Sequence, residues 1–550
     1  MKKALIFLAF LALHSCKDNS TNTPTLKEGT EIVKDSTIQE REYTVLDSKV
    51  LNTKRMWAPF EDDLASYTDS DYTRVKELAF EKTIPEIQNA ISENKLTYED
   101  LVLFYLSRIK KYDRNNELSL NSVITLNSNV LNEARQLDQK ENKAIDPYSI
   151  YGMPILLKDN INVSGMPTTA GALVFENNNA PDSFIAKRLK ENGALILGKA
   201  NLSEWAYFFC GDCPSGYSAV GGQTLNPYGR KIHDTGGSSS GSGVAMAANF
   251  AVAAIGTETS GSILSPSSSN SVVGLKPTVG LLSRIGIVPI SSTLDTPGPM
   301  TRNVVDNAIL LNAMTGQDIH DSASLNLKAP EEDYTSGIKE MKNVKSYLSK
   351  KRLGYFKGSL EDTLYAKAIK DLKNAGAILI EIERQEIDLP QFVRVLNLDM
   401  QNDLPDYIAN YGDKKLTVKN INAITAYNKA DSLMRMPYGQ KLFYGILADK
   451  ATEEEFTAIK DTLQTNGRAF FDIPIEENKL DAILSINNYM AGYAAVAKYP
   501  AITVPMGYKQ DNRPMGLTFI APTLSEKLLL ELAYSYETIS HNRKFPQNYK

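Results

Sequence analysis

Histidine and cysteine are scarce in this sequence. Its 550 residues include four histidines and three cysteines. Beyond the N-terminal region the cysteines are Cys210 and Cys213, which are too few ligands for a structural zinc site. The shortage of histidine also leaves few candidates for the imidazole base that many catalytic sites use.

The chain also lacks an excess of charge of one sign. It carries 60 basic and 65 acidic residues, for a net charge of −5. No segment forms a dense stripe of lysine and arginine, so nothing indicates nucleic-acid binding. Hydrophobic residues make up 42% and charged residues 23%, which is ordinary for a globular protein with a large buried core.

The N-terminal apolar segment is short. Residues 4–13 form an apolar run of ten after a charged start. The run is too short to span a bilayer and is typical of the apolar region of a secretory signal. The residues that follow it, Leu13, Ser15 and Cys16, resemble a bacterial lipobox. Cleavage there would leave Cys16 as the lipidated first residue.

This pattern predicts three regions. Residues 1–15 are a lipoprotein signal peptide, residues 16–60 a polar tether and residues 61–550 the folded domain. The tether is rich in Lys, Asp, Asn, Ser and Thr, as expected of a solvated segment. We expect an exported protein, lipid-anchored in the bacterial cell envelope and facing the periplasm or the surface. A plain secretory peptide is the alternative.

Export changes how the remaining cysteines are interpreted. If Cys16 is acylated, Cys210 and Cys213 remain as an even pair in an oxidising compartment. A local disulfide that closes a loop is the prediction for this Cys-Gly-Asp-Cys segment. A redox-active pair and two free thiols are the alternatives.

Hydrophobic periodicity alternates between the strand and helix patterns from about residue 80 onward. This alternation predicts one large α/β domain, a sheet with covering helices, without tandem repeats. The expected helices lie at 84–91, 101–109, 183–190, 304–314, 362–374 and 525–539, with a mostly helical stretch over 386–471. The expected strands lie at 153–157, 194–197, 353–356, 377–382, 480–486, 501–504 and 517–520.

Residues 236–271 are unusually dense in glycine and serine. The segment also contains a predicted small-residue helix at 243–250 and a predicted strand at 251–255. A flexible Gly/Ser linker would lack this apolar middle. The composition instead suits an acyl-transfer site, because hydroxyls supply a nucleophile and glycines let backbone N–H groups approach a reacting carbonyl. A tight turn at 259–262 offers consecutive N–H groups as an oxyanion hole.

Such a site needs a base, and a lysine is a candidate. Lys158 ends the predicted strand that contains residues 155–157, so its stem lies near the core. Burial would lower the pKa of its amine toward neutrality and let it accept a proton. The alternative is a solvated lysine at the end of a strand.

Several ordered blocks of residues resemble the amidase signature family, over roughly residues 80–545. The resemblance divides the domain into an N-terminal helical part at about 80–145 and a signature core at about 150–315, and it implies a mixed central sheet wrapped by helices. The blocks lie at 152–160, 165–171, 198–205, 221–224, 226–228, 236–262, 294–300 and 499–505.

The resemblance implies a catalytic triad of Lys158, Ser238 and Ser262. Ser262 is the nucleophile, and Ser238, 24 residues earlier and after a cis peptide bond, bridges it to Lys158. Lys199, also after a strand, falls in a structural block. The implied reaction cleaves carboxylic or peptide amides to an acid and ammonia or an amine, without a metal or organic cofactor. The expected oxyanion and substrate-binding residues are Thr259, Ser260, Gly261 and Gly237.

Within the family, the blocks are similar to those of peptide amidases. The tRNA-dependent amidotransferase subunit shares the signature, but the secretion signal argues against that role. The family usually has Asp and then Gly-Gly-Ser-Ile-Arg around the nucleophile, where this chain has Glu258, Ser260 and Leu264. These departures motivate one alternative, a lipid-anchored binding protein that has lost activity. The oligomeric state is left open.

A second alternative is a Ser-His-Asp hydrolase of the α/β-hydrolase type. Residues 237–241 fit the Gly-x-Ser-x-Gly pattern of its nucleophile elbow. That elbow requires a hydrophobic strand immediately before it, and residues 230–235 do not form one. It also requires a downstream histidine, for which His320 and His541 are available.

Overall fold

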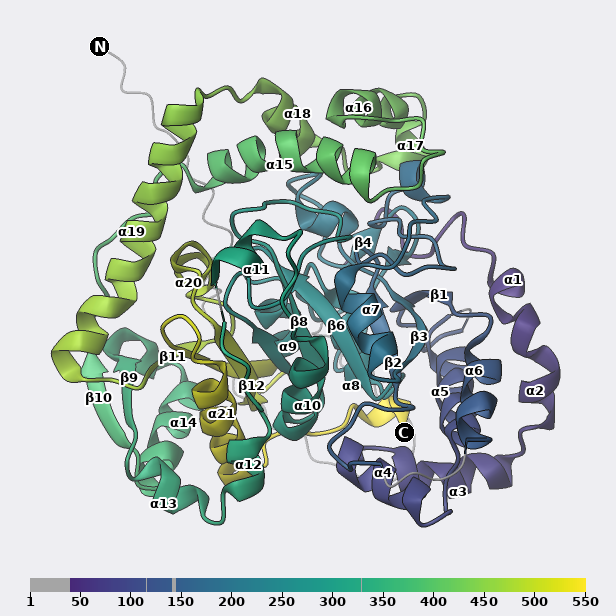
Figure 1. Cartoon of the computed structure of the whole chain (residues 1–550), viewed down its shortest axis with the longest axis horizontal. Coiled ribbons are helices and arrows are strands. Elements are labelled where there is room, and N and C mark those ends of the chain that lie inside the picture. Colours follow the sequence, from purple (N-terminus) through teal and green to yellow (C-terminus); the bar gives the residue numbers. More distant parts are fainter. Residues whose placement is uncertain (1–39, 115, 141–144, 328) are drawn as a thin grey trace. The chain divides into compact units, whose positions relative to one another are not determined.

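A mixed sheet of eleven strands lies at the centre of the computed structural model, which describes residues 40–550 except 115, 141–144 and 328 (Figure 1). The described strands are ordered β1-β3-β2-β6-β8-β7-β12-β13-β11-β9-β10. Strand β2 is parallel to both β3 and β6, whereas β6 is antiparallel to β8. The strands are β1 Val123–Leu126, β2 Pro154–Lys158, β3 Leu195–Ala200, β6 Ala253–Glu258, β7 Val273–Lys276, β8 Thr296–Thr301, β9 Arg352–Phe356, β10 Ile378–Ile382, β11 Ala482–Ile486, β12 Ala501–Tyr508 and β13 Pro514–Ile520, with β4 Tyr217–Ser218 and β5 Gly222–Gln223 in a separate hairpin.

Helices flank the sheet, so the α/β class and the mixed sheet are confirmed. Helices α8, α9, α10 and α21 pack on the strands, and α15, α16 and α18 gather at the top of the view in Figure 1. The helices are α1 Thr53–Trp57, α2 Glu61–Ser66, α3 Asp69–Ala79, α4 Ile84–Ser92, α5 Tyr98–Tyr112, α6 Val130–Asp138, α7 Phe184–Glu191, α8 Ser240–Ala247, α9 Leu264–Ser269, α10 Val304–Met314, α11 Ser322–Leu327, α12 Ser336–Glu340, α13 Val344–Leu348, α14 Thr363–Asn374, α15 Phe392–Asn410, α16 Ile421–Lys429, α17 Ser432–Arg435, α18 Lys441–Ala448, α19 Glu453–Asn478, α20 Ala491–Ala497 and α21 Glu526–Ser540.

Local capping explains why several helices begin where the sequence predicts. Ser183 accepts a hydrogen bond from the third residue of α7, and Asp362 accepts two from the first turn of α14. Asn303 accepts from the Asp306 N–H at the start of α10. Each of these side chains satisfies a backbone donor that has no partner within its own helix.

The Gly/Ser segment differs in register from its prediction. Helix α8 begins at Ser240 rather than at residue 243, and the N–H of Gly241 in its first turn donates to the Asn201 carbonyl at 2.9 Å, outside the helix. It ends at Ala247, shortly before Asn249, whose φ of 57° cannot continue a right-handed helix. Strand β6 consequently starts at residue 253 and extends to Glu258.

The N-terminal boundary also needs correction. The predicted signal, Cys16 and the tether as far as residue 39 lie outside the described residues. Residues 40–60, predicted as tether, instead belong to the compact unit that begins at Glu40. Leu46 accepts a hydrogen bond from the Gln223 N–H at 2.7 Å, and the side chain of Phe60 is 1% exposed. Apolar side chains in this otherwise polar stretch therefore give it a place in the core.

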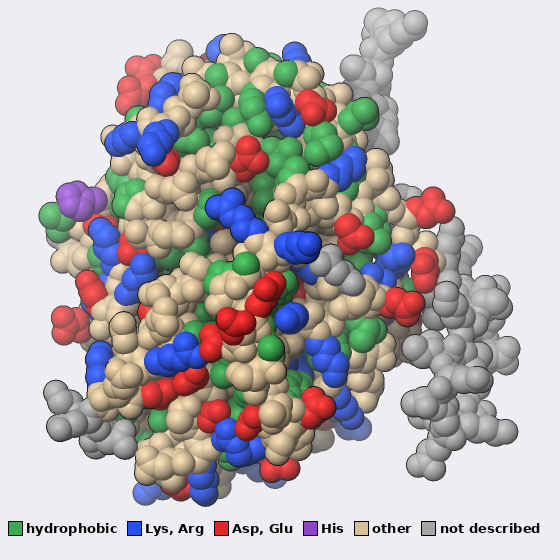
Figure 2. Space-filling model, turned by 90° about the vertical axis from the view of Figure 1, so that its right-hand side faces the viewer, with side chains coloured by type: hydrophobic (Ala, Val, Ile, Leu, Met, Phe, Trp, Pro, Cys, Tyr) green, Lys and Arg blue, Asp and Glu red, His purple; other side chains and the backbone are tan. Residues whose placement is uncertain are grey.

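The surface agrees with the balanced charge of the sequence. On the face shown in Figure 2, basic and acidic side chains are interspersed and no continuous basic band is present. Among the described helices, none is both long and apolar enough to cross a bilayer.

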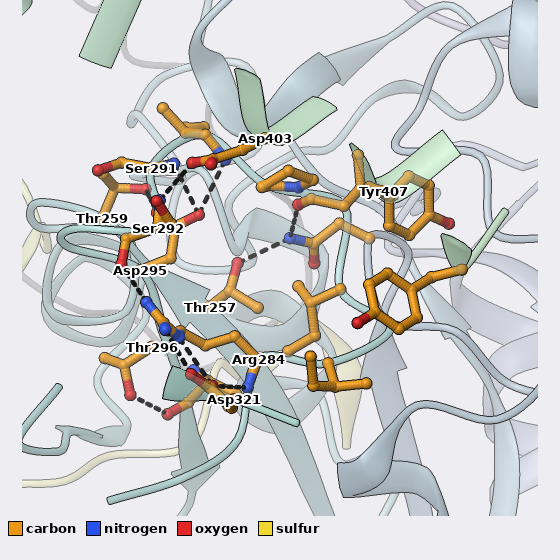
Figure 3. Close-up of a pocket in the computed structure, with 18 of the residues that line it drawn as sticks. Thr257, Thr259, Arg284, Ser291, Ser292, Asp295, Thr296, Asp321, Asp403 and Tyr407 are labelled. Atoms are coloured by element: carbon orange, nitrogen blue, oxygen red, sulfur yellow. Dashed lines mark hydrogen bonds and ion pairs between the residues drawn. The ribbon is translucent and has the colours of Figure 1, made fainter. Parts of the chain in front are cut away.

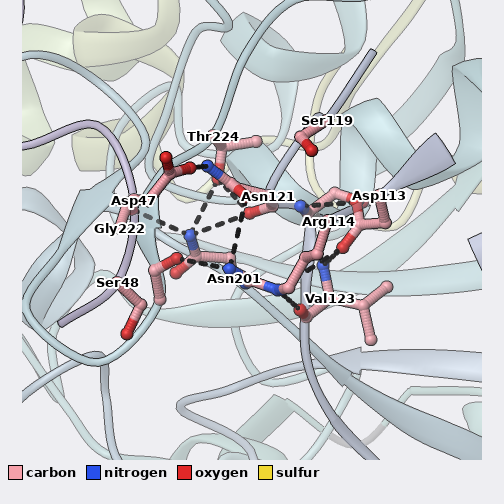
Figure 4. A network of polar contacts seen from close by, with 12 residues as sticks. Asp47, Ser48, Asp113, Arg114, Ser119, Asn121, Val123, Asn201, Gly222 and Thr224 are labelled. Atoms are coloured by element: carbon pink, nitrogen blue, oxygen red, sulfur yellow. Dashed lines mark hydrogen bonds and ion pairs between the residues drawn. The ribbon is translucent and has the colours of Figure 1, made fainter. Parts of the chain in front are cut away.

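A buried polar network connects the N-terminal segment to the sheet (Figure 4). Asp113 accepts hydrogen bonds from the N–H groups of Ser122 and Val123 at 2.7 and 2.9 Å. Arg114 donates to the carbonyls of Val123 and Gly221 at 2.9 and 3.0 Å. These bonds fix the chain entering β1 beside the turn between β4 and β5.

Replacing Arg114 should destabilise the protein. In Arg114→Met the buried carboxylate of Asp113 loses its neighbouring cation, and two carbonyls lose their donors. We expect the free energy of unfolding to fall by about 3 kcal/mol, measured by urea denaturation. Arg55→Met, at an exposed site, is the control. Equal stability of the two variants would contradict a structural role for the network.

Candidate active site

Lys158 is the last residue of β2 and is fully buried. Its Nζ donates to the Ser238 hydroxyl at 2.7 Å, and to the hydroxyl and carbonyl of Thr257 at 2.9 and 3.1 Å. Burial lowers the pKa of Lys158 to about 7, although the carboxylates of Asp295 and Glu258 act in the opposite direction. A substantial fraction of this amine is therefore neutral at physiological pH, and a neutral amine can accept a proton.

Ser238 follows a non-proline cis peptide bond from Gly237 and is fully buried. Its carbonyl accepts a hydrogen bond from the Ser203 N–H at 3.0 Å. The next residue, Ser239, donates its N–H to the carbonyl of Ser262 at 3.1 Å. The Ser239 contact therefore ties the two halves of the Gly/Ser segment together, and the Ser203 contact ties its first half to the chain that follows β3.

Ser262 lies in the turn between β6 and α9, and Glu258 anchors that turn. The buried carboxylate of Glu258 accepts hydrogen bonds from the N–H groups of Gly261 at 2.7 Å, Ile263 at 2.7 Å and Leu264 at 3.0 Å. Gly261 has a φ of 86°, and a Cβ there would approach the Asn488 side chain to 2.9 Å. In the sequence, Glu258 was notable only because the family usually has the shorter Asp at this position. That its carboxylate accepts three backbone hydrogen bonds was not predicted.

The same contacts refine the predicted oxyanion residues. The N–H of Gly261 is committed to Glu258 and is not free for a ligand in this structure. Thr259, at the start of the turn, is held through its side chain, which donates to Asp295 at 2.5 Å. Asp295 also accepts from the N–H groups of Ile290 and Ser291 at 2.8 and 3.0 Å. Burial raises the pKa of Asp295.

Thr257 is a site residue that sequence reasoning missed. It supplies two of the three acceptors around the Lys158 amine, and its hydroxyl also accepts from Asn160 Nδ2 at 3.0 Å. Only its position along β6 could have identified Thr257 from the sequence. Leu157 of β2 pairs in register with Ile255 of β6, so a residue two positions further along β6 lies near the end of β2.

The second lysine that follows a strand has a structural environment. Lys199 is fully buried, and its Nζ forms an ion pair with Asp159 at 3.0 Å. It also donates to the Thr168 hydroxyl at 2.8 Å. Because its charge is compensated by a carboxylate, Lys199 suits a cationic, structural role, whereas no carboxylate of the described residues is in direct contact with Lys158.

The two cysteines lie in a loop next to Ser203. The structure pairs Cys210 with Cys213 as a disulfide, with Cα atoms 5.8 Å apart. The Tyr207 hydroxyl donates to the Cys213 carbonyl at 2.8 Å, and the Gly216 N–H donates to the Ser203 hydroxyl at 2.8 Å. Because the Ser203 N–H contacts the Ser238 carbonyl, this loop packs directly behind the Ser238 segment.

A cavity of about 210 Å³ lies beside the Lys158 site (Figure 3). Asn160, Thr257 and Thr259 line one wall, and thus connect the cavity to both the lysine and the turn. The Arg284–Asp321 ion pair and Asp403 line other parts. In the described part of the chain, no group of three or more His, Cys, Asp or Glu residues is arranged to hold a metal ion.

The geometry does not favour a nucleophile elbow at 237–241. The residues before Gly237 form no strand. Ser239, the central serine of the pattern, donates its hydroxyl to the Thr257 carbonyl at 3.1 Å. Neither His320 nor His541 forms a hydrogen bond through its ring within the described residues.

Comparisons with known proteins identify the family of this chain. The family model described as Amidase matches residues 100–530. A probable amidase from Arabidopsis thaliana is 36% identical over 486 residues, covering 85% of this chain and 91% of that protein. The crystal structure of an amidase family protein from Bacillus anthracis superposes with a TM-score of 0.85 at 38% identity, covering 92% of this chain and 99% of that one.

A peptide amidase from Stenotrophomonas maltophilia has a TM-score of 0.79 at 35% identity, and the match covers 85% of this chain and 98% of that one. These matches span most of the described chain, including β2, β6 and the turn that carries Ser262. The chain therefore belongs to the amidase family and is an amide-hydrolysing enzyme.

Proposed function

We propose that this enzyme cleaves carboxylic or peptide amides through an acyl-enzyme on Ser262, with Ser238 and Lys158 moving the protons. The observation that carries the proposal is the 2.7 Å contact between Lys158 Nζ and the Ser238 hydroxyl. It joins a buried amine whose pKa is about 7 to the hydroxyl that the family pattern assigns as the bridge.

The proposed reaction balances its protons at each step. Neutral Lys158 takes the proton of Ser238, which takes the proton of Ser262 as Ser262 Oγ attacks the carbonyl carbon. Ser238 then protonates the departing nitrogen while the C–N bond breaks, and Lys158 returns its proton to Ser238, leaving an ester on Ser262. In deacylation Ser238 and Lys158 take a proton from the attacking water and then return one to Ser262 Oγ as the acid departs, which regenerates the free enzyme.

The oxyanion that forms during attack needs donors from the turn. Because the Gly261 N–H is committed to Glu258, the N–H groups of Thr259, Ser260 and Ser262 are the donors we propose. The Glu258 carboxylate fixes the direction of these groups before substrate arrives. Gly237 lies on the loop before α8, where a Cβ would come within 2.6 Å of the Ser203 hydroxyl, so the absence of a side chain allows this loop to pack against Ser203.

The similarity to a peptide amidase supports peptide amides as substrates. All three catalytic positions are filled, and Lys158 and Ser238 are in contact. This argues against a binding protein that has lost its activity. The departures at Ser260 and Leu264 do not remove a group that the proposed relay uses.

Ser262→Ala should lower amide hydrolysis by several orders of magnitude, because the covalent route disappears. Release of ammonia from C-terminally amidated peptides and from simple aryl and alkyl amides measures the effect. Ser265→Ala, which removes a hydroxyl from the same segment, is the control and should retain activity. Comparable turnover by Ser262→Ala and the wild type would exclude the acyl-enzyme.

The pH dependence of amide hydrolysis by the wild type should reveal the protonation state of Lys158. Below its pKa of about 7 Lys158 is protonated and cannot accept the proton of Ser238. We therefore expect kcat/KM for an uncharged amide to fall as the pH drops through about 7 and to level off above it. A pH–rate profile from pH 5.5 to 9 measures this. A flat profile across neutrality would contradict a neutral lysine as the base.

We also propose that the protein is exported and anchored in the bacterial cell envelope through a lipid on Cys16. Support comes from the apolar run at 4–13 and the lipobox-like residues before Cys16. In a bacterial host, Cys16→Ala should move the protein from the membrane fraction to the soluble or precursor fraction. The same membrane partition for the variant and the wild type would refute the lipid anchor.

A further inference from the structure

The cavity beside the Lys158 site is lined by more acidic than basic side chains. Its lining includes the carboxylates of Asp295, Asp321, Asp403 and Asp406, but only one guanidinium, that of Arg284. The imidazole of His320 and the phenols of Tyr407 and Tyr411 complete the titratable groups of the lining. Figure 3 shows Asp295 and Asp403 grouped with Ser291 and Ser292, apart from the Arg284–Asp321 pair.

The single guanidinium is already neutralised. Arg284 Nε and Nη2 form a bidentate pair with the two oxygens of Asp321 at 2.9 and 2.5 Å. Arg284 Nη1 donates to the Ser292 carbonyl. Every nitrogen of this side chain therefore has a partner, and Arg284 does not compensate the remaining carboxylates by direct contact.

Those remaining carboxylates form no ion pair within the described residues. Asp403 accepts the Ser292 N–H at 2.6 Å, and Asp406 accepts the Asn410 side chain at 2.7 Å. Burial and the neighbouring carboxylate of Asp399 raise the pKa of Asp403 to about 7. A carboxylate in this state lacks the cation that would stabilise its charged form.

An independent observation comes from Asn160, which lines the same cavity and is 2% exposed. Its Nδ2 donates to the Thr257 hydroxyl and the Val288 carbonyl at 3.0 and 3.4 Å, which fixes the orientation of the amide. Its Oδ1 is buried and has no hydrogen-bond partner in the part of the chain that the structure describes. A buried acceptor without a donor is costly, and here it lies beside a cavity that can hold a ligand.

We propose that this cavity binds a positively charged ammonium or guanidinium group of the substrate, so that the enzyme prefers amides that carry a cation near the scissile bond. The inference rests on the proposed function. A cation supplies the hydrogen-bond donors that Asn160 Oδ1 lacks and the positive charge that Asp295, Asp403 and Asp406 lack. An anionic group would face these same carboxylates and be rejected.

The position and the volume of the cavity also support binding of a cationic group of the substrate. Thr257 contacts the Lys158 amine and Thr259 begins the turn to Ser262, and both line the cavity. A group seated here can therefore belong to the molecule whose amide is attacked. The volume of about 210 Å³ suits one side-chain-sized group rather than a whole substrate.

The test compares matched amides that differ in one charge. N-acetyl-lysine amide and N-acetyl-norleucine amide place the difference in the acyl part, and the N-(4-aminobutyl) and N-pentyl amides of acetic acid place it in the amine part. We expect kcat/KM for the cationic member of at least one pair to exceed that of the neutral member by about tenfold or more.

Asp403→Asn should reduce this ratio to less than about threefold, because the variant removes one of the carboxylates that attract the cation. Asp406→Asn is a second variant, at a more exposed position, and should reduce the ratio in the same direction. Glu454→Gln, on the exposed surface of α19, is the matched control and should leave the ratio unchanged. Equal kcat/KM within both pairs for the wild type, or an unchanged ratio in Asp403→Asn, would overturn the inference.

A binding measurement separates this inference from the proposed function. Calorimetric titration of Ser262→Ala with the same four amides needs no turnover. If the wild type hydrolyses none of the amides but Ser262→Ala binds the cationic members preferentially, the cation site stands and the proposed reaction on these substrates fails. If Ser262→Ala shows no preference for the cationic members, the cation site is refuted.

Discussion

The burial of the Lys158 amine is the constraint on which the proposed chemistry depends. An exposed lysine stays protonated at neutral pH, and a carboxylate in contact favours the protonated form, as Asp159 does for Lys199 in opposition to the burial that lowers the pKa of Lys199. Lys158 is fully buried, yet its direct partners are hydroxyls and a carbonyl. Such partners satisfy its hydrogen bonds without fixing a positive charge, so desolvation controls its protonation.

This environment requires β2 and β6 to lie side by side. Both strands consist of residues that are buried on both faces, as is typical of the parallel part of an α/β sheet. Their parallel register brings Lys158, at the end of β2, next to Thr257 near the end of β6. Ser238 enters from the loop before α8, and its neighbour Ser239 is tied to Ser262. The sheet therefore fixes the position of Lys158, and the loops bring the serine hydroxyls toward it.

The sequence was sufficient for the parts of the structure that depend on local patterns. Helix α10 has the predicted bounds because Asn303 caps it and its apolar residues recur at helical spacing. The strands flanking Lys158 were found because they are short apolar runs bounded by glycine and polar residues. The α/β class follows from their alternation with helices. The assignment of Lys158, Ser238 and Ser262 came from resemblance, since spacing alone did not distinguish these residues.

What the sequence could not provide were contacts between distant segments. Residues 40–60 have the composition of a tether, and their place against Gln223 depends on hydrogen bonds that no local pattern reveals. The commitment of the Gly261 N–H to Glu258 depends on how the turn folds back on the end of its own strand. The register of α8 was wrong by three residues because glycine and serine have low helix propensity, whereas a backbone donor of the first turn, the Gly241 N–H, finds its partner in the distant Asn201 carbonyl.

Successive residues at the end of β6 have different roles in the site. Successive side chains of a strand point to opposite sides. Thr257 and Thr259 line the cavity, whereas Glu258, between them, turns its carboxylate to the backbone that carries Ser262. Because side chains alternate along the strand, the two threonines face the cavity and Glu258 holds the turn that carries Ser262. Because Thr257 also holds the Lys158 amine, a group bound in the cavity would contact the same residue that positions the base. Under the proposed cation binding, recognition of the substrate and control of the lysine would be coupled through a single threonine.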